Sequence, residues 1–173
     1  MRKFLTLTLL FCFIACQSES QKETTPPTFP SHTEILTPSG TVIKTRIALT
    51  WKDQEQGLSG VRPQDFDDDE ALLFFNLEDA QRNFWMPDTY FDLDIFYLDQ
   101  NLKILDIVRK LPHYIGRANP DLIPRARSVW GRHVFEMKAG SPVSSSLNID
   151  DQLQWKNPMT LQQATEIAKR IER

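Results

Sequence analysis

Short apolar runs separated by turn-forming residues fill the chain from residue 41 onward, and this pattern constrains the fold more than any other feature. The runs are rich in β-branched and aromatic residues, which is typical of strands, and they lie at 41–49, 71–75, 94–98, 102–108 and 132–137. Turn-forming residues 99–101 predict a hairpin, and the run 94–98, apolar on both faces, predicts a central strand. A last run at 153–155 is expected to close the sheet. We therefore predict a mainly β fold with short helices (α+β), a small compact sandwich or barrel-like single domain.

Two short helical segments are expected within this domain. Thr50 has the position of a helix N-cap and Gly57 that of a C-terminal stop, which predicts a helix over residues 51–56. Further along, residues 140–142 open a helical turn that runs to Leu147. Both segments are too short to form a helical layer, so they are expected at the periphery of the sheet.

The C-terminal residues 159–173 are predicted to form an amphipathic helix after a β-rich domain at 32–158. Thr160 and Gln163 have the spacing of a capping box. The apolar stripe of the helix consists of Leu161, Ala164, Ile167, Ala168 and Ile171. The simplest interpretation is that this stripe packs on the domain; the alternative is that it binds a partner.

The N-terminus has the pattern of a secretory signal. Two basic residues, Arg2 and Lys3, precede an apolar run at 4–14. This run is shorter than the roughly 20 apolar residues that span a bilayer. It ends at Ala15-Cys16, and small residues before a cysteine at this point resemble the lipobox of bacterial lipoproteins.

The lipobox resemblance implies that residues 1–15 are removed as a lipoprotein signal peptide and that Cys16 is lipidated, so that acyl chains anchor the protein to a membrane. Gln17, rather than aspartate, favours the outer membrane, with the protein facing the periplasm. An ordinary signal peptide with a chance cysteine is the alternative. Cys12 would leave with the signal, so the folded domain would contain no thiol.

Residues 16–31 are expected to act as a flexible tether behind the lipidated cysteine. They are polar and rich in Pro, Ser and Thr, so they bury too little apolar surface to offset the entropy of ordering. The net charge of the whole chain is -3, which provides no basic footprint for nucleic acid. The expected partners are the membrane, through the anchor, and an envelope protein or a small ligand.

Several motifs follow one another in a distinctive order. They are Thr50 with Gln56-Gly57-Leu58, Ala71-Leu72-Leu73-Phe74, Phe84-Trp85-Met86-Pro87-Asp88-Thr89, Asp92-Leu93-Asp94-Ile95 and Val134-Phe135-Glu136-Met137-Lys138-Ala139-Gly140. Together they resemble the family called domain of unknown function 192, over about residues 40–155. The sequence departs from the family pattern at Ala71, where the family has Gly, and at Pro87-Asp88, where it has Lys-Asn. The resemblance implies a fold and a site but no reaction.

The candidate ligand-binding residues lie in and after the Phe-Trp-Met motif and are Trp85, Met86, Asp88, Thr89, Asp92 and Asp94. Asp92 and Asp94 share a face if their segment is extended. With Asp88 in the preceding turn, three carboxylates would then converge, able to act as acid and base for a substrate or ligand, or to bind a hard cation. Structural roles are the alternative for each of the three. Trp85 and Met86 line an adjacent pocket or belong to the core.

A structural role makes a specific demand on Asp94. An unpaired buried charge is costly, so this carboxylate must be paired or exposed. If Asp94 is structural, we expect it to accept backbone N–H groups from the turn at residues 87–89. If it is functional, we expect its replacement to leave stability nearly unchanged or to raise it.

No catalytic motif emerges from the sequence. The three histidines, His32, His113 and His133, are far apart and match no zinc-binding pattern. The serines at 144–146 lack a nucleophile elbow. No metal or cofactor is therefore expected, and the leading hypothesis is a non-catalytic module that binds a small ligand or an envelope partner. A hydrolase or lyase that uses paired aspartates near Asp88 and Asp94 is the alternative, and a purely structural lipoprotein is a third.

Overall fold

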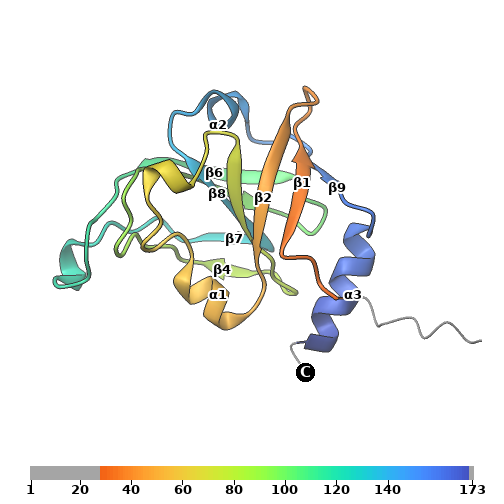
Figure 1. Cartoon of the computed structure of the whole chain (residues 1–173), viewed down its shortest axis with the longest axis horizontal. Coiled ribbons are helices and arrows are strands. Elements are labelled where there is room, and N and C mark those ends of the chain that lie inside the picture. The colour runs from red at the N-terminus through yellow and green to blue at the C-terminus, as the bar shows by residue number, and fades with distance from the viewer. Residues whose placement is uncertain (1–27, 172–173) are drawn as a thin grey trace, which may run out of the picture.

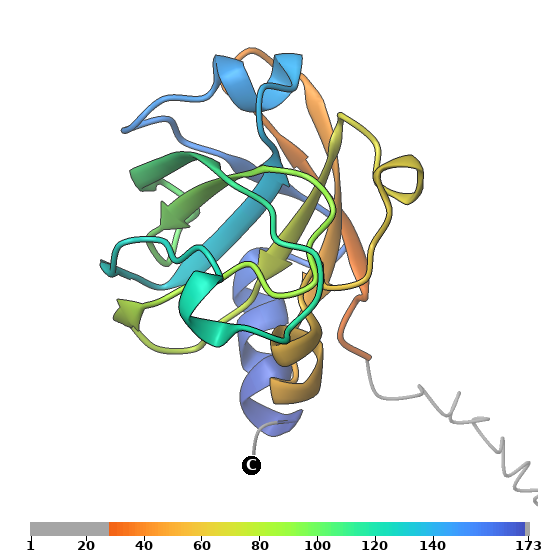
Figure 2. The same cartoon turned by 90° about the vertical axis from the view of Figure 1, so that its left-hand side faces the viewer.

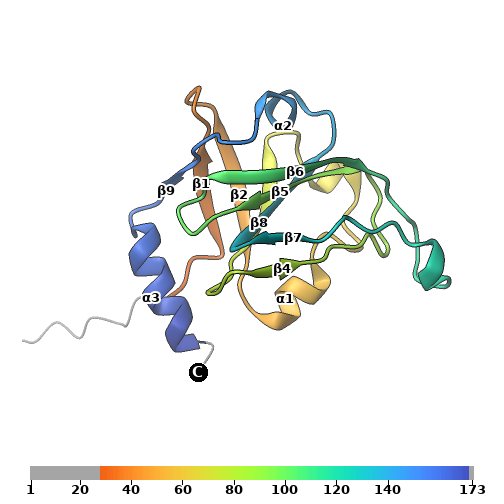
Figure 3. The same ribbon diagram turned by 180° about the vertical axis from the view of Figure 1, so that it is seen from behind.

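The computed structural model describes residues 28–171, which form a strongly curled sheet with a few short helices around it (Figures 1 and 3). In sheet order the strands are β6 (Ile104–Leu111), β5 (Leu93–Leu98), β8 (His133–Lys138), β3 (Glu70–Phe74), β2 (Val42–Ala48), β1 (His32–Leu36) and β9 (Gln154–Lys156). A second, two-stranded sheet pairs β4 (Ala80–Arg82) with β7 (Val129–Gly131). The predicted mainly β single domain is confirmed.

Helices lie at the ends of the curled sheet. Figures 1 and 2 show α2 (Pro142–Ser146) at one end, and α1 (Trp51–Gln56) and α3 (Leu161–Ile171) toward the other. Two 3-10 turns, η1 (Pro63–Asp65) and η2 (Pro120–Leu122), lie in the connecting loops. The loop that carries η2 projects from the body of the molecule (Figure 3). None of the helices in the described part of the chain is long and apolar enough to cross a membrane.

Parallel pairing occurs at one point of the large sheet, between β2 and β3, and the other neighbouring strands that the structure describes are antiparallel. The connection from β2 to β3 contains α1, because parallel strands need a crossover rather than a tight turn. The predicted hairpin is β5 with β6, and β5 lies between β6 and β8. All six residues of β5 are buried, which confirms the predicted central strand.

Two hydrophobic cores cover the two faces of the sheet. The first core includes Ile43, Leu73, Phe96, Phe135 and Met137, together with Ala164 and Ala168 of α3. The second core includes Leu72, Phe74, Ile95, Tyr97 and Val134. Successive residues of β3, β5 and β8 alternate between the two cores, as the period of a strand requires. The candidate functional site lies on the face of the second core.

The C-terminal helix packs on the domain, as its apolar stripe predicts. Ala164, Ile167 and Ala168 are buried. The capping box is present: the Thr160 N–H donates to Oε1 of Gln163 at 2.9 Å, and the Gln163 N–H donates to Oγ1 of Thr160 at 3.1 Å. The apolar stripe of the helix therefore packs against the first core of the domain.

Three strands, β1, β4 and β7, were not predicted from the sequence. β4 and β7 have three residues each, too few to show any periodicity. β1 alternates exposed and buried residues, but it begins directly after the segment that we expected to be a tether. The backbone N–H of Ile47 donates to the carbonyl of Ser31, so β2 also pairs with the residue just before β1. The two cysteines, Cys12 and Cys16, and the predicted signal lie outside the described residues.

Candidate functional site

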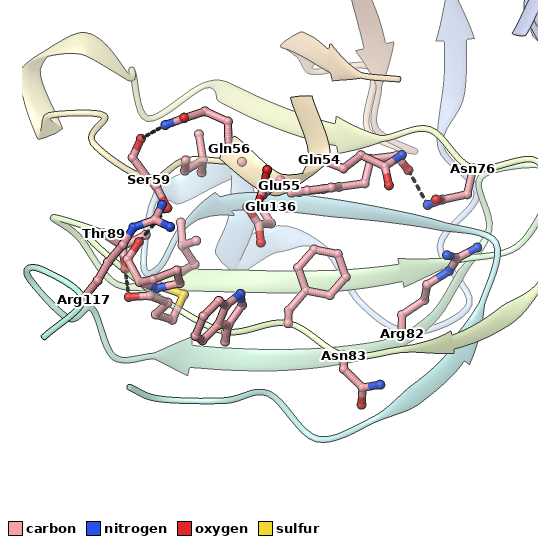
Figure 4. A pocket seen from close by; sticks show the side chains of 18 of the residues that line it. Gln54, Glu55, Gln56, Ser59, Asn76, Arg82, Asn83, Thr89, Arg117 and Glu136 are labelled. Carbon is pink, nitrogen blue, oxygen red and sulfur yellow. Dashed lines mark hydrogen bonds between the residues drawn. The ribbon is translucent and has the colours of Figure 1, made fainter. Parts of the chain in front are cut away.

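A cleft of about 410 Å³ opens over the second core (Figure 4). Three parts of the chain enclose it: α1 with the turn that follows it, residues 81–87, and the strands β3 and β8. Its apolar walls include Leu58, Phe74, Phe84, Trp85, Met86 and Leu93. Its polar rim carries the amide side chains of Gln54, Gln56, Asn76, Gln81 and Asn83. An apolar cleft with a few polar groups is the usual form of a small-ligand site.

Local sequence signals place α1 at the mouth of the cleft. Thr50 caps the helix in a full capping box with Asp53, and Gly57 ends it with a φ of 50°. A side chain at position 57 would meet the ring of Phe74 at 3.4 Å, so glycine also allows the close approach to β3. Gln54 Nε2 donates to the carbonyl of Phe75 at 3.3 Å and thereby ties α1 to the end of β3.

The floor of the cleft holds a buried acid, Glu136 of β8. Its side chain is 4% exposed and faces the second core, between Leu72 of β3 and Ile95 of β5. Among residues 28–171, no hydrogen bond or ion pair reaches its carboxyl group. No fully enclosed side-chain oxygen of these residues lacks a partner, so the carboxyl oxygens of Glu136 are reached from the cleft. Burial raises the pKa of this carboxyl to about 8, because the charged form loses its hydration. Figure 4 shows Glu136 in the middle of the cleft, beneath α1.

Aromatic side chains form the wall beside Glu136. The ring of Phe84 packs edge-on against Phe74, with a centroid distance of 4.8 Å. Trp85 is 44% exposed, and the guanidinium of Arg125 lies 5.0 Å from the centroid of its ring. Met86 is fully buried and belongs to the second core as well as to the cleft. The structure thus brings two of the candidate residues, Trp85 and Met86, to the cleft.

Thr89 also lines the cleft, but its hydroxyl is occupied by the protein. Thr89 Oγ1 donates to the carbonyl of Met86 at 2.6 Å. The hydroxyl of Ser59, on the same side, donates to the carbonyl of Pro87 at 2.6 Å. Both hydroxyls therefore hold the turn at residues 86–89 in place.

Asp88 holds together the turn and the loop that faces it. Its backbone has a φ of 53°, a conformation that Asp tolerates better than most residues. Its carboxylate accepts hydrogen bonds from the Tyr90 hydroxyl at 3.0 Å and from the Gly116 N–H at 3.2 Å. The Asp88 carbonyl accepts from the Gly60 N–H at 2.8 Å. Both donors reach the same oxygen, Oδ1, and tie Asp88 to its own neighbours.

Asp92 and Asp94 each have a separate partner on or just beyond β6. Asp92 accepts from the backbone N–H of His113 and lies 2.7 Å from its ring Nδ1, and these bonds lower the pKa of Asp92. Asp94 is 2% exposed; it accepts from the backbone N–H of Lys110 at 2.8 Å and from Arg109 Nη1 at 2.9 Å. The hydroxyl of Ser144 donates to the same carboxylate.

The three aspartates therefore do not converge on one point, and the described residues contain no group of acids, histidines or cysteines arranged to hold a metal. The donors to Asp94 also differ from the expected turn at 87–89. A register shift between Leu93 and Ile95 lets β6 present Arg109 and Lys110 to Asp94. That irregularity has no signature in the sequence, so the expected partners of Asp94 were wrong.

Glu136 is the residue that sequence reasoning missed as a site. Its motif contributed to the family resemblance, but the acid was not singled out. The available signal was its setting: a carboxylate between Phe135 and Met137 in an otherwise apolar strand. Strand alternation places it on the face of Val134 rather than on that of Phe135. Knowing that this face meets a cleft required the tertiary structure.

Fold and cleft together define a small, mainly β, single-domain protein with an acidic group buried beneath an apolar cleft. The chain belongs to the family DUF192, described as "Uncharacterized ACR", whose model matches residues 34–155. No curated protein matches the chain.

Two solved structures share the fold. One is a "putative transcription regulator" from Sinorhizobium meliloti 1021, with a TM-score of 0.55 and 22% identity, covering 72% of this chain and 92% of that one. The other is a protein of unknown function from Novosphingobium aromaticivorans DSM 12444, with a TM-score of 0.56 and 21% identity, covering 72% of this chain and 84% of that one. At these identities the likeness concerns the fold alone.

Proposed function

We propose that this protein is a small-ligand-binding module of the bacterial envelope, and that its ligand occupies the cleft over Glu136. The observation that carries the proposal is the carboxyl of Glu136, which is buried, faces a cavity of about 410 Å³ and has no hydrogen-bond or ion-pair partner among residues 28–171. A buried polar group normally has a partner. A group that lacks one and faces a cavity is a candidate for contact with a ligand.

The other groups of the cleft support binding rather than nucleophilic catalysis. Nucleophilic catalysis needs a nucleophile with a base within hydrogen-bond reach. The two hydroxyls beside the cleft, on Ser59 and Thr89, donate to backbone carbonyls. The described residues that line the cleft include no histidine and no cysteine.

Paired aspartates near Asp88 and Asp94 receive less support as a hydrolytic or lyase site. Both carboxylate oxygens of Asp94 accept protein donors, from Lys110, Arg109 and Ser144. Asp88 is bound by Tyr90 and Gly116. Neither carboxylate lines the cleft, whereas Trp85, Met86 and Thr89 do.

Binding in the cleft is tested by ligand-observed NMR with a collection of small soluble compounds, on the purified protein and on Asn83→Trp. Asn83 is exposed at the rim of the cleft, so a bulky indole there should obstruct the cleft without disturbing the core. We expect compounds that bind the parent protein to lose binding in Asn83→Trp. A matched control is Asn101→Trp, at an exposed turn position outside this cleft. The proposal fails if no compound binds, or if both variants bind alike.

The proposed location rests on the N-terminal sequence. We infer that Cys16 is lipidated and that the domain is held at the outer membrane, facing the periplasm, by the tether at 16–31. The support is the small-residue and cysteine pattern directly after the apolar run. Two or more acyl chains hold a protein firmly, since each buried methylene contributes about 0.8 kcal/mol.

A cysteine substitution tests this anchor. Cys16→Ala should move the protein from the membrane fraction to the soluble fraction or leave it unprocessed, and metabolic labelling with palmitate should no longer mark it. Cys12→Ala is the matched control and should leave labelling intact. Membrane association that persists in Cys16→Ala through processing at another site would contradict the lipid anchor.

A further inference from the structure

Resting on the proposed function, we propose that the ligand of the cleft is an organic cation: an ammonium or guanidinium group on an apolar body, with the cation seated against Glu136. The class of ligand follows from what the carboxyl lacks and from what surrounds it.

The carboxyl at the floor of the cleft needs hydrogen-bond donors that residues 28–171 do not supply. The side chain of Glu136 is 4% exposed, and the described residues offer it no N–H or O–H group. A carboxylate accepts hydrogen bonds only, and its strongest partners are cationic donors. A ligand with an ammonium or guanidinium group would supply both the donors and the compensating charge.

The walls of the cleft suit a cation with an apolar body. Phe74, Phe84 and Trp85 line the cleft, and aromatic rings attract cations through the negative potential of their faces. The ring of Trp85 already attracts the guanidinium of Arg125, 5.0 Å from its centroid. Met86 and Leu93 add apolar surface for the rest of the ligand.

The arginines of the cleft leave the place beside Glu136 open. Figure 4 shows Arg82 and Arg117 toward opposite ends of the cleft, with Glu136 between them. Arg82 donates to the carbonyls of Glu78 and Gly131. Burial raises the pKa of Glu136, and no ion pair or hydrogen bond joins Arg82 or Arg117 to its carboxyl. No cation of the described chain therefore competes with a ligand for this carboxyl.

Proton balance makes the proposal quantitative. With a pKa of about 8, the carboxyl of Glu136 is protonated in about nine molecules of ten at pH 7. A cation would bind the ionised form, and the O–H proton of the carboxyl would pass to solvent. Binding should therefore strengthen about tenfold for each pH unit up to pH 8 and then level off. A neutral ligand that accepts a hydrogen bond from the protonated acid would show the opposite trend.

A matched pair of probes separates these cases. Benzylguanidinium and benzylurea have nearly the same shape, but the first carries a positive charge across the whole pH range and the second is neutral. We would measure the affinity of both by isothermal titration calorimetry at pH 6, 7, 8 and 9, in buffers of different ionisation enthalpy. The proteins would be the parent, Glu136→Gln, and Glu34→Gln as the matched control on the distant strand β1.

We expect benzylguanidinium to bind the parent at least tenfold more tightly than benzylurea at pH 8, with release of nearly one proton at pH 7. Glu136→Gln should lose this preference and the pH dependence, and Glu34→Gln should keep both. Equal or tighter binding of benzylurea, pH-independent binding of the cation, or no binding of either probe would overturn the cationic ligand. Binding of benzylurea that Asn83→Trp abolishes would overturn the ligand class alone and leave the proposed binding function standing.

Discussion

Two buried carboxyl groups lie on neighbouring strands of this protein, and their surroundings are opposite. Asp94 of β5 pairs in register with Met137, and Glu136 of β8 pairs with Ile95, so the two acids are one register position apart and face opposite cores. Both are nearly inaccessible, at 2% and 4% exposed. Asp94 accepts from three donors, whereas the described part of the chain offers none to Glu136.

The contrast separates an acid that is bound within the fold from an acid that we propose binds a ligand. Asp94 links β6 and α2, because Arg109 of β6 and Ser144 of α2 both donate to it. Such a network lowers the cost of burying its charge. Glu136 gains nothing of this kind from the protein, and its burial raises its pKa to about 8. The predictions below test this difference.

Removal of Asp94 should have the largest effect on stability. Asp94→Ala leaves the Lys110 N–H without its acceptor. It also leaves the Arg109 guanidinium without its counter-charge, although Arg109 still donates to the carbonyls of Ser144 and Leu147. Breaking a buried pair costs about 3–5 kcal/mol, and the partial exposure of Arg109 places the expected loss near 3 kcal/mol. Urea denaturation measures it. Asp92→Ala, which removes an exposed pair with His113, is the control and should cost less than about 1 kcal/mol. Equal losses in both variants would contradict the structural role of Asp94.

Glu136 should make the protein less stable as pH rises. Its pKa is near 4.5 when unfolded and about 8 when folded, so between these values the folded state binds more protons. Its contribution is therefore full below pH 4.5 and is lost as pH rises to 8, by about 1.4 kcal/mol per pH unit. The free energy of unfolding of the parent and of Glu136→Gln, measured from pH 5 to pH 8.5, should diverge at this rate, with the variant more stable at pH 8.

His133, a second buried titratable group, also makes the stability of the parent protein depend on pH, with the opposite sign. Burial lowers the pKa of His133 to about 3, because the charged imidazolium loses hydration on the other face of β8. Its contribution to stability is lost as pH falls below its unfolded value near 6.5, the opposite sign to that of Glu136. The Glu136→Gln difference should be unaffected by His133. A difference that does not change with pH would show that Glu136 is not buried as described.

The smallest expected effect on stability comes from removing a helix cap, either at α1 beside the cleft or at α3 away from it. Thr50→Ala and Thr160→Ala each remove the cap of a capping box, one at α1 and the other at α3. Each should cost about 1 kcal/mol of stability. Only Thr50→Ala should also weaken ligand binding, because α1 borders the cleft and α3 does not. Amide hydrogen exchange measures the stability of each helix, and calorimetry measures ligand binding. If both variants weakened binding equally, α1 would not be part of the binding site.

Local sequence signals predicted much of the fold. Thr50 and Gly57 marked α1 to the residue, the turn at 99–101 marked the β5–β6 hairpin, and Thr160 with Gln163 marked the start of α3. These features depend on neighbours in the chain. The three-residue strands β4 and β7 depend instead on pairing across the fold, between Gln81 and Trp130, and so left no periodic pattern.

The site was predicted only in part. Trp85, Met86 and Thr89 do lie at the cleft, since the whole motif folds along its wall. Asp88, Asp92 and Asp94 were expected to converge because they lie close together in the sequence, but each has its own partner. Glu136 becomes a site only when β3, β5 and β8 are assembled beneath α1. This assembly depends on tertiary contacts between segments that are distant in the sequence, so no local sequence pattern predicts it.

The most direct test of the account is the titration of Glu136 itself. The side-chain carboxyl carbon of each glutamate is followed by NMR of ¹³C-labelled protein from pH 3 to pH 10, and the Glu136 signal is assigned by its absence in Glu136→Gln. The account expects an apparent pKa of about 8 for Glu136, falling when benzylguanidinium is bound. A titration midpoint near the ordinary value of 4.5 would show that the carboxyl is hydrated or paired, and would contradict the proposed site.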